Sequence, residues 1–164
     1  MKRFPRIRRF LEALLHTHDT PHRTAAAFAL GVFFGFSPFL GLHTVLGLVC
    51  AFLLNLNRIA VVLGVYSNLP WILPAYYTVA TVAGAALLGV EVPTGLVEGL
   101  LRALMSASWS TAWNRVRSLT PLVEAFLLGS TLGAVVLAGC AYYVSLGMIV
   151  AHRRLQAHKR LANP

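Results

Sequence analysis

Long stretches without a charged side chain dominate this sequence. Residues 24–57, 59–90 and 125–151 contain no Lys, Arg, Asp or Glu, and they are 34, 32 and 27 residues long. A helix needs about 20 mostly apolar residues to cross a bilayer, so each run is long enough to enter the hydrocarbon layer. Three such runs in one small chain predict an all-α, polytopic membrane protein whose membrane domain spans residues 24–151.

Basic residues gather outside these runs. The chain has a formal net charge of +9, and ten of its fourteen Lys and Arg residues lie within residues 1–23 and 152–164. Basic side chains beside apolar segments are retained in the cytoplasm and attract anionic lipid headgroups. We therefore expect the lipid bilayer as a partner, no nucleic acid, and both termini on the cytoplasmic side of the membrane.

The two ends of the chain are predicted to be basic cytoplasmic segments. In residues 1–23, apolar side chains such as Phe4, Ile7 and Leu11 recur at helical spacing against a basic face. This pattern is typical of an amphipathic helix lying at the membrane surface. A helix packed on the cytoplasmic end of the protein itself is the alternative, and residues 152–164 form the basic tail.

The first uncharged run is too long for one straight crossing. A helix over residues 24–57 would be about 50 Å long, against a hydrocarbon layer of about 30 Å. Gly35, Pro38 and Gly41 mark a break, because proline interrupts a helix and glycine tolerates sharp turns. The arms on either side, 24–36 and 42–57, are short for full crossings, which favours a re-entrant, broken hairpin.

The second run, residues 59–90, has the same design. Pro70 and Pro74 interrupt it, and the sequence from Leu30 to Phe33 recurs in similar form from Leu63 to Tyr66. This indicates a weak internal repeat with a period near 33, although so short a match also arises by chance in an apolar chain. Paired apolar segments interrupted by Gly and Pro favour a binding site near the middle of the membrane.

Several of these motifs together resemble a known family. They are Pro21-His22-Arg23, Ala29 to Phe33, Ser37 to Thr44, Asn57, Asn68-Leu69-Pro70 and Tyr76-Tyr77. In this order and spacing they resemble the bacterial membrane family called domain of unknown function 2062. The resemblance implies a small polytopic inner-membrane protein, sometimes joined to or encoded beside glycosyltransferase-like proteins, and it supplies no established activity. His43 departs from the family pattern, which more often has glutamine there.

Cytoplasmic termini require an even number of crossings. The simplest arrangement makes 24–57 a hairpin that dips and returns, 59–90 a crossing, and 125–151 a transmembrane helix that crosses back, with Arg58 cytoplasmic. The mirror arrangement makes 59–90 the hairpin. Residues 91–124 are expected to be an interfacial connection, since Trp109 and Trp113 suit headgroup depth.

Gly129 and Gly133 in the third run allow another helix to approach closely. Packing within one chain and self-association into a homo-oligomer both fit this spacing, so both interpretations stay open.

Polar residues close to the breaks are the candidate substrate-binding residues, because a polar group in hydrocarbon needs a partner. The set is Ser37, Pro38, His43, Asn57, Asn68 and Pro70, with Arg23 and Arg58 attracting anionic groups. Each also has a structural interpretation. Asn55 and Asn57 suit helix C-caps or interfacial groups. Asn68 suits a cap as well as a substrate contact, and His43 suits a satisfied structural histidine as well as a proton relay or a bond to an anionic group.

The sequence favours a protein that is not an enzyme. It contains no catalytic motif, its five carboxylates all lie outside the uncharged runs, and His16, His18, Asp19 and His22 form only a loose cluster. We expect no catalytic residue, metal or cofactor.

Two functions remain. One is transport or handling of a small anionic or lipid-linked substrate between two broken segments, and the other is a membrane scaffold that recruits a partner such as a glycosyltransferase.

Overall fold

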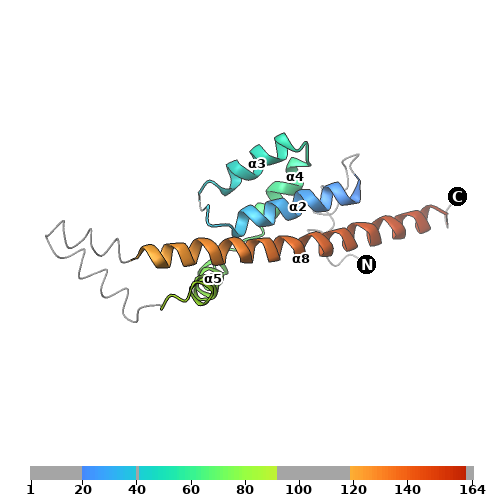
Figure 1. Ribbon diagram of the computed structural model, residues 1–164. Helices are drawn as coiled ribbons and strands as arrows, with labels where there is room; N and C mark the ends of the chain where they lie inside the picture. Colours follow the sequence, from blue (N-terminus) through green and yellow to red (C-terminus); the bar gives the residue numbers. More distant parts are fainter. Residues whose placement is uncertain (1–19, 40, 92–118, 162–164) are drawn as a thin grey trace. The chain divides into compact units, whose positions relative to one another are not determined.

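The computed structural model describes residues 20–39, 41–91 and 119–161 (Figure 1). These residues form five α-helices and no strand, which confirms the all-α fold class. The helices are α2 (Pro21–Phe36), α3 (His43–Leu53), α4 (Arg58–Val65), α5 (Leu73–Leu88) and α8 (Thr120–Leu161). Most of the basic segment 1–23 and of the interfacial connection, with Trp109 and Trp113, lies outside the described residues.

The chain divides into two compact units. The first consists of Met1–Leu69 and Gly133–Pro164, and the second of Pro70–Leu132. Helices α2, α3 and α4 belong to the first unit and α5 to the second, while α8 contributes residues to both.

Helices stop at both proline segments. Helix α2 ends at Phe36, and α3 begins only at His43 after a turn in which Gly41 has a φ of 88°. Helix α4 ends at Val65, and α5 begins at Leu73. The interruptions predicted around Pro38 and Pro70 are therefore present.

The predicted arm boundaries were wrong at several ends. Helix α2 begins at Pro21 instead of residue 24, because Thr20 caps it and a proline fits the first position of a helix. The boundary predicted at residue 23 therefore falls inside a helix. Helix α8 runs well beyond 125–151 at both ends, since charged residues are compatible with a helix wherever it leaves an apolar environment.

Helix α3 ends earlier than the predicted residue 57 because Asn55 adopts a left-handed conformation, with a φ of 51°. The amide of Asn55 donates to the carbonyl of Phe52 at 3.2 Å, and that of Leu56 donates to Ala51 at 2.8 Å. This pair of bonds is a Schellman motif, which satisfies carbonyls that would otherwise be orphaned at the helix end. The capping interpretation of Asn55 is confirmed.

Helices α2, α3 and α4 pack into the core of the first unit. Its fully buried members include Ala27, Ala51 and Val61, with Phe34 and Val65 beside them. The closest approach is between α2 and α4 at Gly31 and Gly64. A Cβ atom added to Gly31 would lie 2.1 Å from the carbonyl oxygen of Val61, and one added to Gly64 would lie 2.2 Å from that of Phe28. Only glycine permits this backbone contact.

In the second unit, α5 packs against the first turns of α8 in a similar way. A Cβ atom on Gly84 would lie within 2 Å of the carbonyl oxygen of Ala125, and one on Gly129 would meet that of Ala80. The Tyr76 hydroxyl donates to the carbonyl of Ser130 at 2.8 Å. Gly129 therefore serves packing within the chain, one of the two interpretations its spacing allowed.

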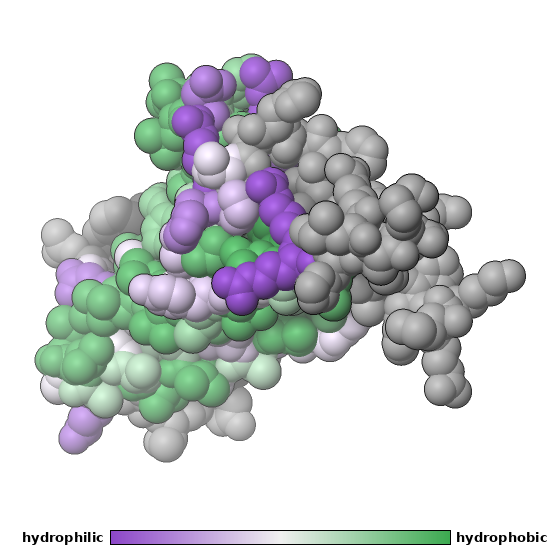
Figure 2. Space-filling view, turned by 90° about the vertical axis from the view of Figure 1, so that its right-hand side faces the viewer, coloured by the Kyte–Doolittle hydropathy of each residue, from purple (hydrophilic) through white to green (hydrophobic). Residues whose placement is uncertain are grey.

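The outer surface is strongly apolar. Large side chains on α3, α5 and α8 are at least half exposed, among them Phe52, Leu53, Val79, Leu87 and Val136. Figure 2 shows apolar side chains covering much of one face, with hydrophilic side chains gathered in part of it. Among the described helices, only the stretch Thr120–Leu155 of α8 is long and apolar enough to cross a membrane, and α3 and α5 are shorter apolar helices.

Candidate functional site

Helices α2 and α4 run in the same direction. Gly31 lies against Val61 and Gly64, and further along both helices Gly35 lies against Val65. Their carboxyl ends therefore lie together, which we call the break end. Their amino ends lie together with the α3–α4 turn (residues 52–59), and we call this the cationic end. Helix α2 has 16 residues and is about 24 Å long, so the two ends are far apart.

The break end contains Ser37, Pro38 and Asn68. The Ser37 hydroxyl donates to the carbonyl of Phe34 at 2.8 Å, and the Asn68 amide donates to the carbonyl of Gly35 at 2.8 Å. The last carbonyls of a helix have no partner within it, and these two side chains supply one. Pro38 is half-buried in the segment that leaves α2, while Pro70 is the first residue of the second unit.

His43 is the first residue of α3, where it is half-buried. Its Nδ1 atom accepts a hydrogen bond from the backbone amide of Gly41 at 3.2 Å. This bond stabilises the tight turn between α2 and α3, so the histidine has a local structural partner. Its role as a proton relay stays a prediction.

Polar side chains inside the described parts of the chain are fully satisfied. No buried side-chain nitrogen or oxygen there lacks a hydrogen-bond partner. At the break end, Ser37 and Asn68 serve the helix carbonyls directly, and Ser67 does the same for Gly64 at 2.7 Å. The break end is thus a closed joint between α2 and α4.

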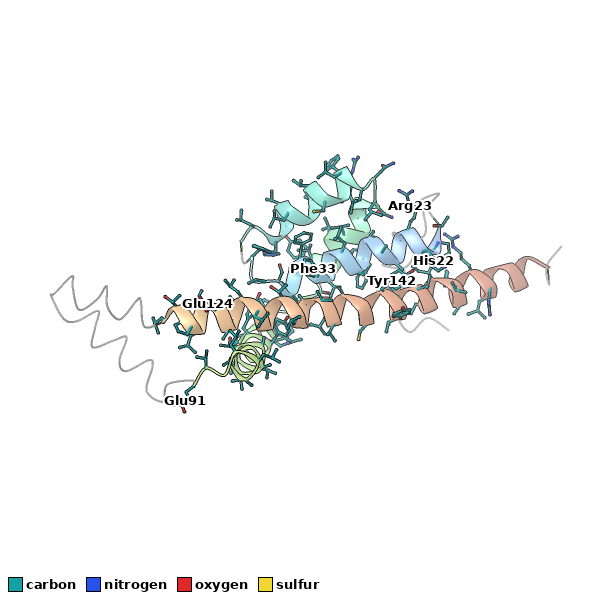
Figure 3. All side chains as sticks on the ribbon, viewed as in Figure 1. His22, Arg23, Phe33, Glu91, Glu124 and Tyr142 are labelled. Carbon is teal, nitrogen blue, oxygen red and sulfur yellow. The ribbon has the colours of Figure 1, made fainter. Side chains whose placement is uncertain are left out.

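Arg23 closes the α2–α3 hairpin at the cationic end. Its Nη2 atom donates to the carbonyl oxygen of Asn55 at 2.6 Å, across 32 residues of sequence. The bond joins the first turn of α2 to the carboxyl end of α3, where a positive charge is favoured by the helix dipole. On the other side of α2, His22 points toward α8, and its Nδ1 atom lies 2.9 Å from the hydroxyl of Tyr142 (Figure 3).

Arg58 begins α4 and is exposed. Its guanidinium carbon lies 3.8 Å from the centre of the Phe52 ring, a cation–π contact. Asn57 caps the same helix, because its Oδ1 atom accepts hydrogen bonds from the amides of Ile59 and Ala60 at 3.0 and 3.2 Å. The sequence predicted that Asn57 caps the carboxyl end of a helix, and this was wrong, because α3 already ends before Asn55 and Asn57 caps the amino end of α4. The arginine side chains are the cationic donors of this end.

The first unit lacks acidic residues wherever the structure describes it, namely 20–39, 41–69 and 133–161. Its charged side chains there are all basic. No group of three or more metal-ligating side chains occurs among the described residues of the chain. The electrostatic character of this unit favours anions.

From the sequence we expected half-helix amino termini and Arg23 or Arg58 to attract an anionic group to a site between the two broken segments. The structure instead brings the arginines together with Asn57 at the cationic end, because α2 and α4 are parallel and place their carboxyl ends at the break end. The sequence also missed the contacts of Arg23 with Asn55 and of His22 with Tyr142, since no local pattern identifies partners so distant in sequence.

The comparisons with known proteins give a family but no activity. The family model described as "Uncharacterized protein conserved in bacteria (DUF2062)" matches residues 5–158. No curated protein and no solved structure matches the chain.

Proposed function

This chain belongs to the uncharacterised bacterial family DUF2062, and from that premise we propose that it is a multi-pass inner-membrane protein that transports or handles a small anionic or lipid-linked substrate. The observation that carries the proposal is the closed α2–α3 hairpin. The bond between Arg23 and Asn55 holds its two ends together, while the chain turns back after Pro38.

The dimensions of this hairpin support a re-entrant segment. Helix α3 has 11 residues and is about 16 Å long, roughly half the hydrocarbon thickness. Its outward side chains are apolar, including Val45, Val49 and Leu53. A short apolar hairpin with both ends on one side fits a segment that enters the membrane and returns.

The remaining helices support two crossings. Helices α4 and α5 have 8 and 16 residues, about 12 and 24 Å, and in the proposed topology both belong to the run 59–90 that makes one crossing. The stretch Thr120–Leu155 of α8 is long enough to cross back. The closed α2–α3 hairpin supports this arrangement over its mirror, and both termini and Arg58 are then cytoplasmic.

The break end is the proposed moving joint of the transport cycle. The side chain of Asn68 links the loop after α4 to the end of α2. Changing this link alters how the two broken segments meet without touching the cationic end. The substrate carries negative charge because the charged side chains described in the first unit are all basic.

Flux measurements in proteoliposomes test this function. We expect the full chain to accelerate the exchange of a fluorescent anionic phospholipid between leaflets, and we expect Asn68→Ala to abolish that activity. Ser67→Ala is the matched control, because Ser67 bonds only within its own helix end. Equal flux in empty and protein-containing vesicles would refute the transport proposal.

A scaffold function is the second candidate, favoured by the surface of α8. Gly139 and Gly147 are exposed, and no atom lies within 4 Å of a Cβ added to either, so neither is used for packing in the described residues. If the protein recruits a glycosyltransferase-like partner, replacing both glycines with Leu will abolish co-purification with that partner. If this variant exchanges phospholipid at the normal rate but no longer co-purifies with the partner, the result would favour the scaffold over the transporter.

A further inference from the structure

The α3–α4 turn combines two kinds of exposed side chain that rarely occur together on a soluble surface. Leu53 is 79% exposed, and Phe52, Leu54 and Ile59 are each more than half exposed. Arg58 is exposed among them. An apolar patch next to basic side chains matches the boundary between acyl chains and anionic headgroups.

The turn is held rigidly. The Schellman bonds from Asn55 and Leu56 fix the end of α3, and Asn57 fixes the start of α4. The guanidinium of Arg23 ties the turn to α2 through the carbonyl of Asn55. The exposed side chains therefore keep their positions relative to one another without a ligand, which lowers the entropy cost of binding one.

The orientation of Arg58 suits a phosphate diester. The guanidinium carbon of Arg58 lies 3.8 Å from the centre of the Phe52 ring, and a guanidinium has N–H donors enough to give a phosphate oxygen pair two parallel hydrogen bonds. The backbone amides at the start of α4 do not compete, since Asn57 already occupies those of Ile59 and Ala60.

We propose that the α3–α4 turn is a binding site for an anionic phospholipid of the cytoplasmic leaflet. Arg58 binds the phosphate, Arg23 adds positive charge and positions the turn, and Leu53 and Ile59 contact the glycerol and upper acyl chains. The proposed site specifies that the protein recognises the phosphate of an anionic headgroup. This proposal rests on the proposed function, because the turn must lie at a membrane to meet such a lipid.

Lipid binding by the full chain tests the site. The protein is purified in a maltoside detergent, and native mass spectrometry measures its affinity for phosphatidylglycerol and for zwitterionic phosphatidylcholine. We expect phosphatidylglycerol to bind more tightly, and we expect Arg58→Gln to weaken it about tenfold, the effect of losing one charge-assisted pair of hydrogen bonds. Arg58→Lys keeps the charge but loses the guanidinium contact with Phe52. Its affinity for phosphatidylglycerol should therefore lie between those of the unmodified chain and of Arg58→Gln.

Arg154→Gln is the matched control, because Arg154 is an exposed arginine on α8 and not part of the α3–α4 turn. The affinity of this control variant for phosphatidylglycerol should stay within about twofold of that of the unmodified chain. The proposed site would be overturned if both Gln variants lost the same affinity for phosphatidylglycerol, or if Arg58→Gln lost none. Displacement of the lipid by excess inorganic phosphate would also overturn it, in favour of a soluble anion.

The two proposals fail in different ways. If alkaline carbonate extracts the chain from bacterial membranes, the membrane function is wrong, whatever the lipid affinity. If the chain resists extraction and Arg58→Gln binds phosphatidylglycerol normally, the site alone is wrong.

Discussion

Single glycine residues set the distance between helices in this protein. Gly31 and Gly64 contact each other reciprocally, since each would direct a Cβ atom at a carbonyl oxygen three residues before the other. These two glycines occupy equivalent positions in the short repeat with a period near 33. The repeat therefore has a structural counterpart, because residues 28, 31 and 32 of α2 meet residues 61, 64 and 65 of α4 in matching pairs.

Replacing Gly31 with Ala should separate α2 from α4. The added methyl group would lie 2.1 Å from the carbonyl of Val61, and backbone atoms cannot move aside as a flexible side chain can. We expect a loss of about 1–3 kcal/mol in stability, or failure to fold. Thermal denaturation in detergent measures it. Gly139→Ala is the control, and it should be neutral or stabilising by up to ~1 kcal/mol, since that glycine has open space. Equal melting temperatures for the two variants would contradict this account.

Asn57 offers a second prediction for a single side chain. Asn57→Ala removes the acceptor for the amides of Ile59 and Ala60, so stability should fall by about 0.5–2 kcal/mol. Asn57→Asp retains the acceptor and should restore most of the loss. The same denaturation assay checks both variants, and an Asp variant as unstable as the Ala variant would rule out the capping role.

At the level of elements, the α2–α3 hairpin is the feature that most determines topology. Two helices of unequal length, 16 and 11 residues, are joined by a proline and glycine turn and closed by one arginine. In the proposed topology, a hairpin closed in this way keeps both of its ends on one side of the membrane, and α4 continues from that side.

Cysteine accessibility tests this topology directly. In a chain whose Cys50 and Cys140 are replaced by Ala, a cysteine introduced in place of Leu53 should react with an impermeant maleimide only when the reagent reaches the cytoplasmic side. A cysteine in place of Arg154 should behave in the same way, because α8 returns to that side. Labelling of the Leu53 site from the periplasmic side would instead support the mirror arrangement.

For the whole molecule, two units share one long helix. Each unit has its own glycine-mediated helix contact, between α2 and α4 in one and between α5 and α8 in the other. In each unit, large apolar side chains of the described residues are exposed, such as Leu53 in one unit and Leu87 in the other. Because water disfavours contiguous apolar surface, this exterior supports the proposed membrane environment.

Membrane extraction provides the prediction at this scale. We expect the chain to remain in the membrane fraction after alkaline carbonate treatment and to require detergent for solubilisation. Fractionation followed by immunoblotting measures this. A monodisperse protein in detergent-free buffer would show that the apolar exterior is covered in some other way and that the chain is not integral to the membrane.

The sequence by itself determined the all-α class, the family, the positions of both breaks and the capping role of Asn55. These properties depend on local chemistry: proline removes a backbone donor, asparagine tolerates a left-handed turn or accepts amide bonds, and uncharged runs favour apolar surroundings. Only the tertiary structure decided that Arg23 and Arg58 lie at the cationic end and that Asn68 joins α4 to α2. Such contacts depend on the relative direction of two helices, and that direction follows from backbone packing at Gly31 and Gly64, which no spacing along the chain specifies.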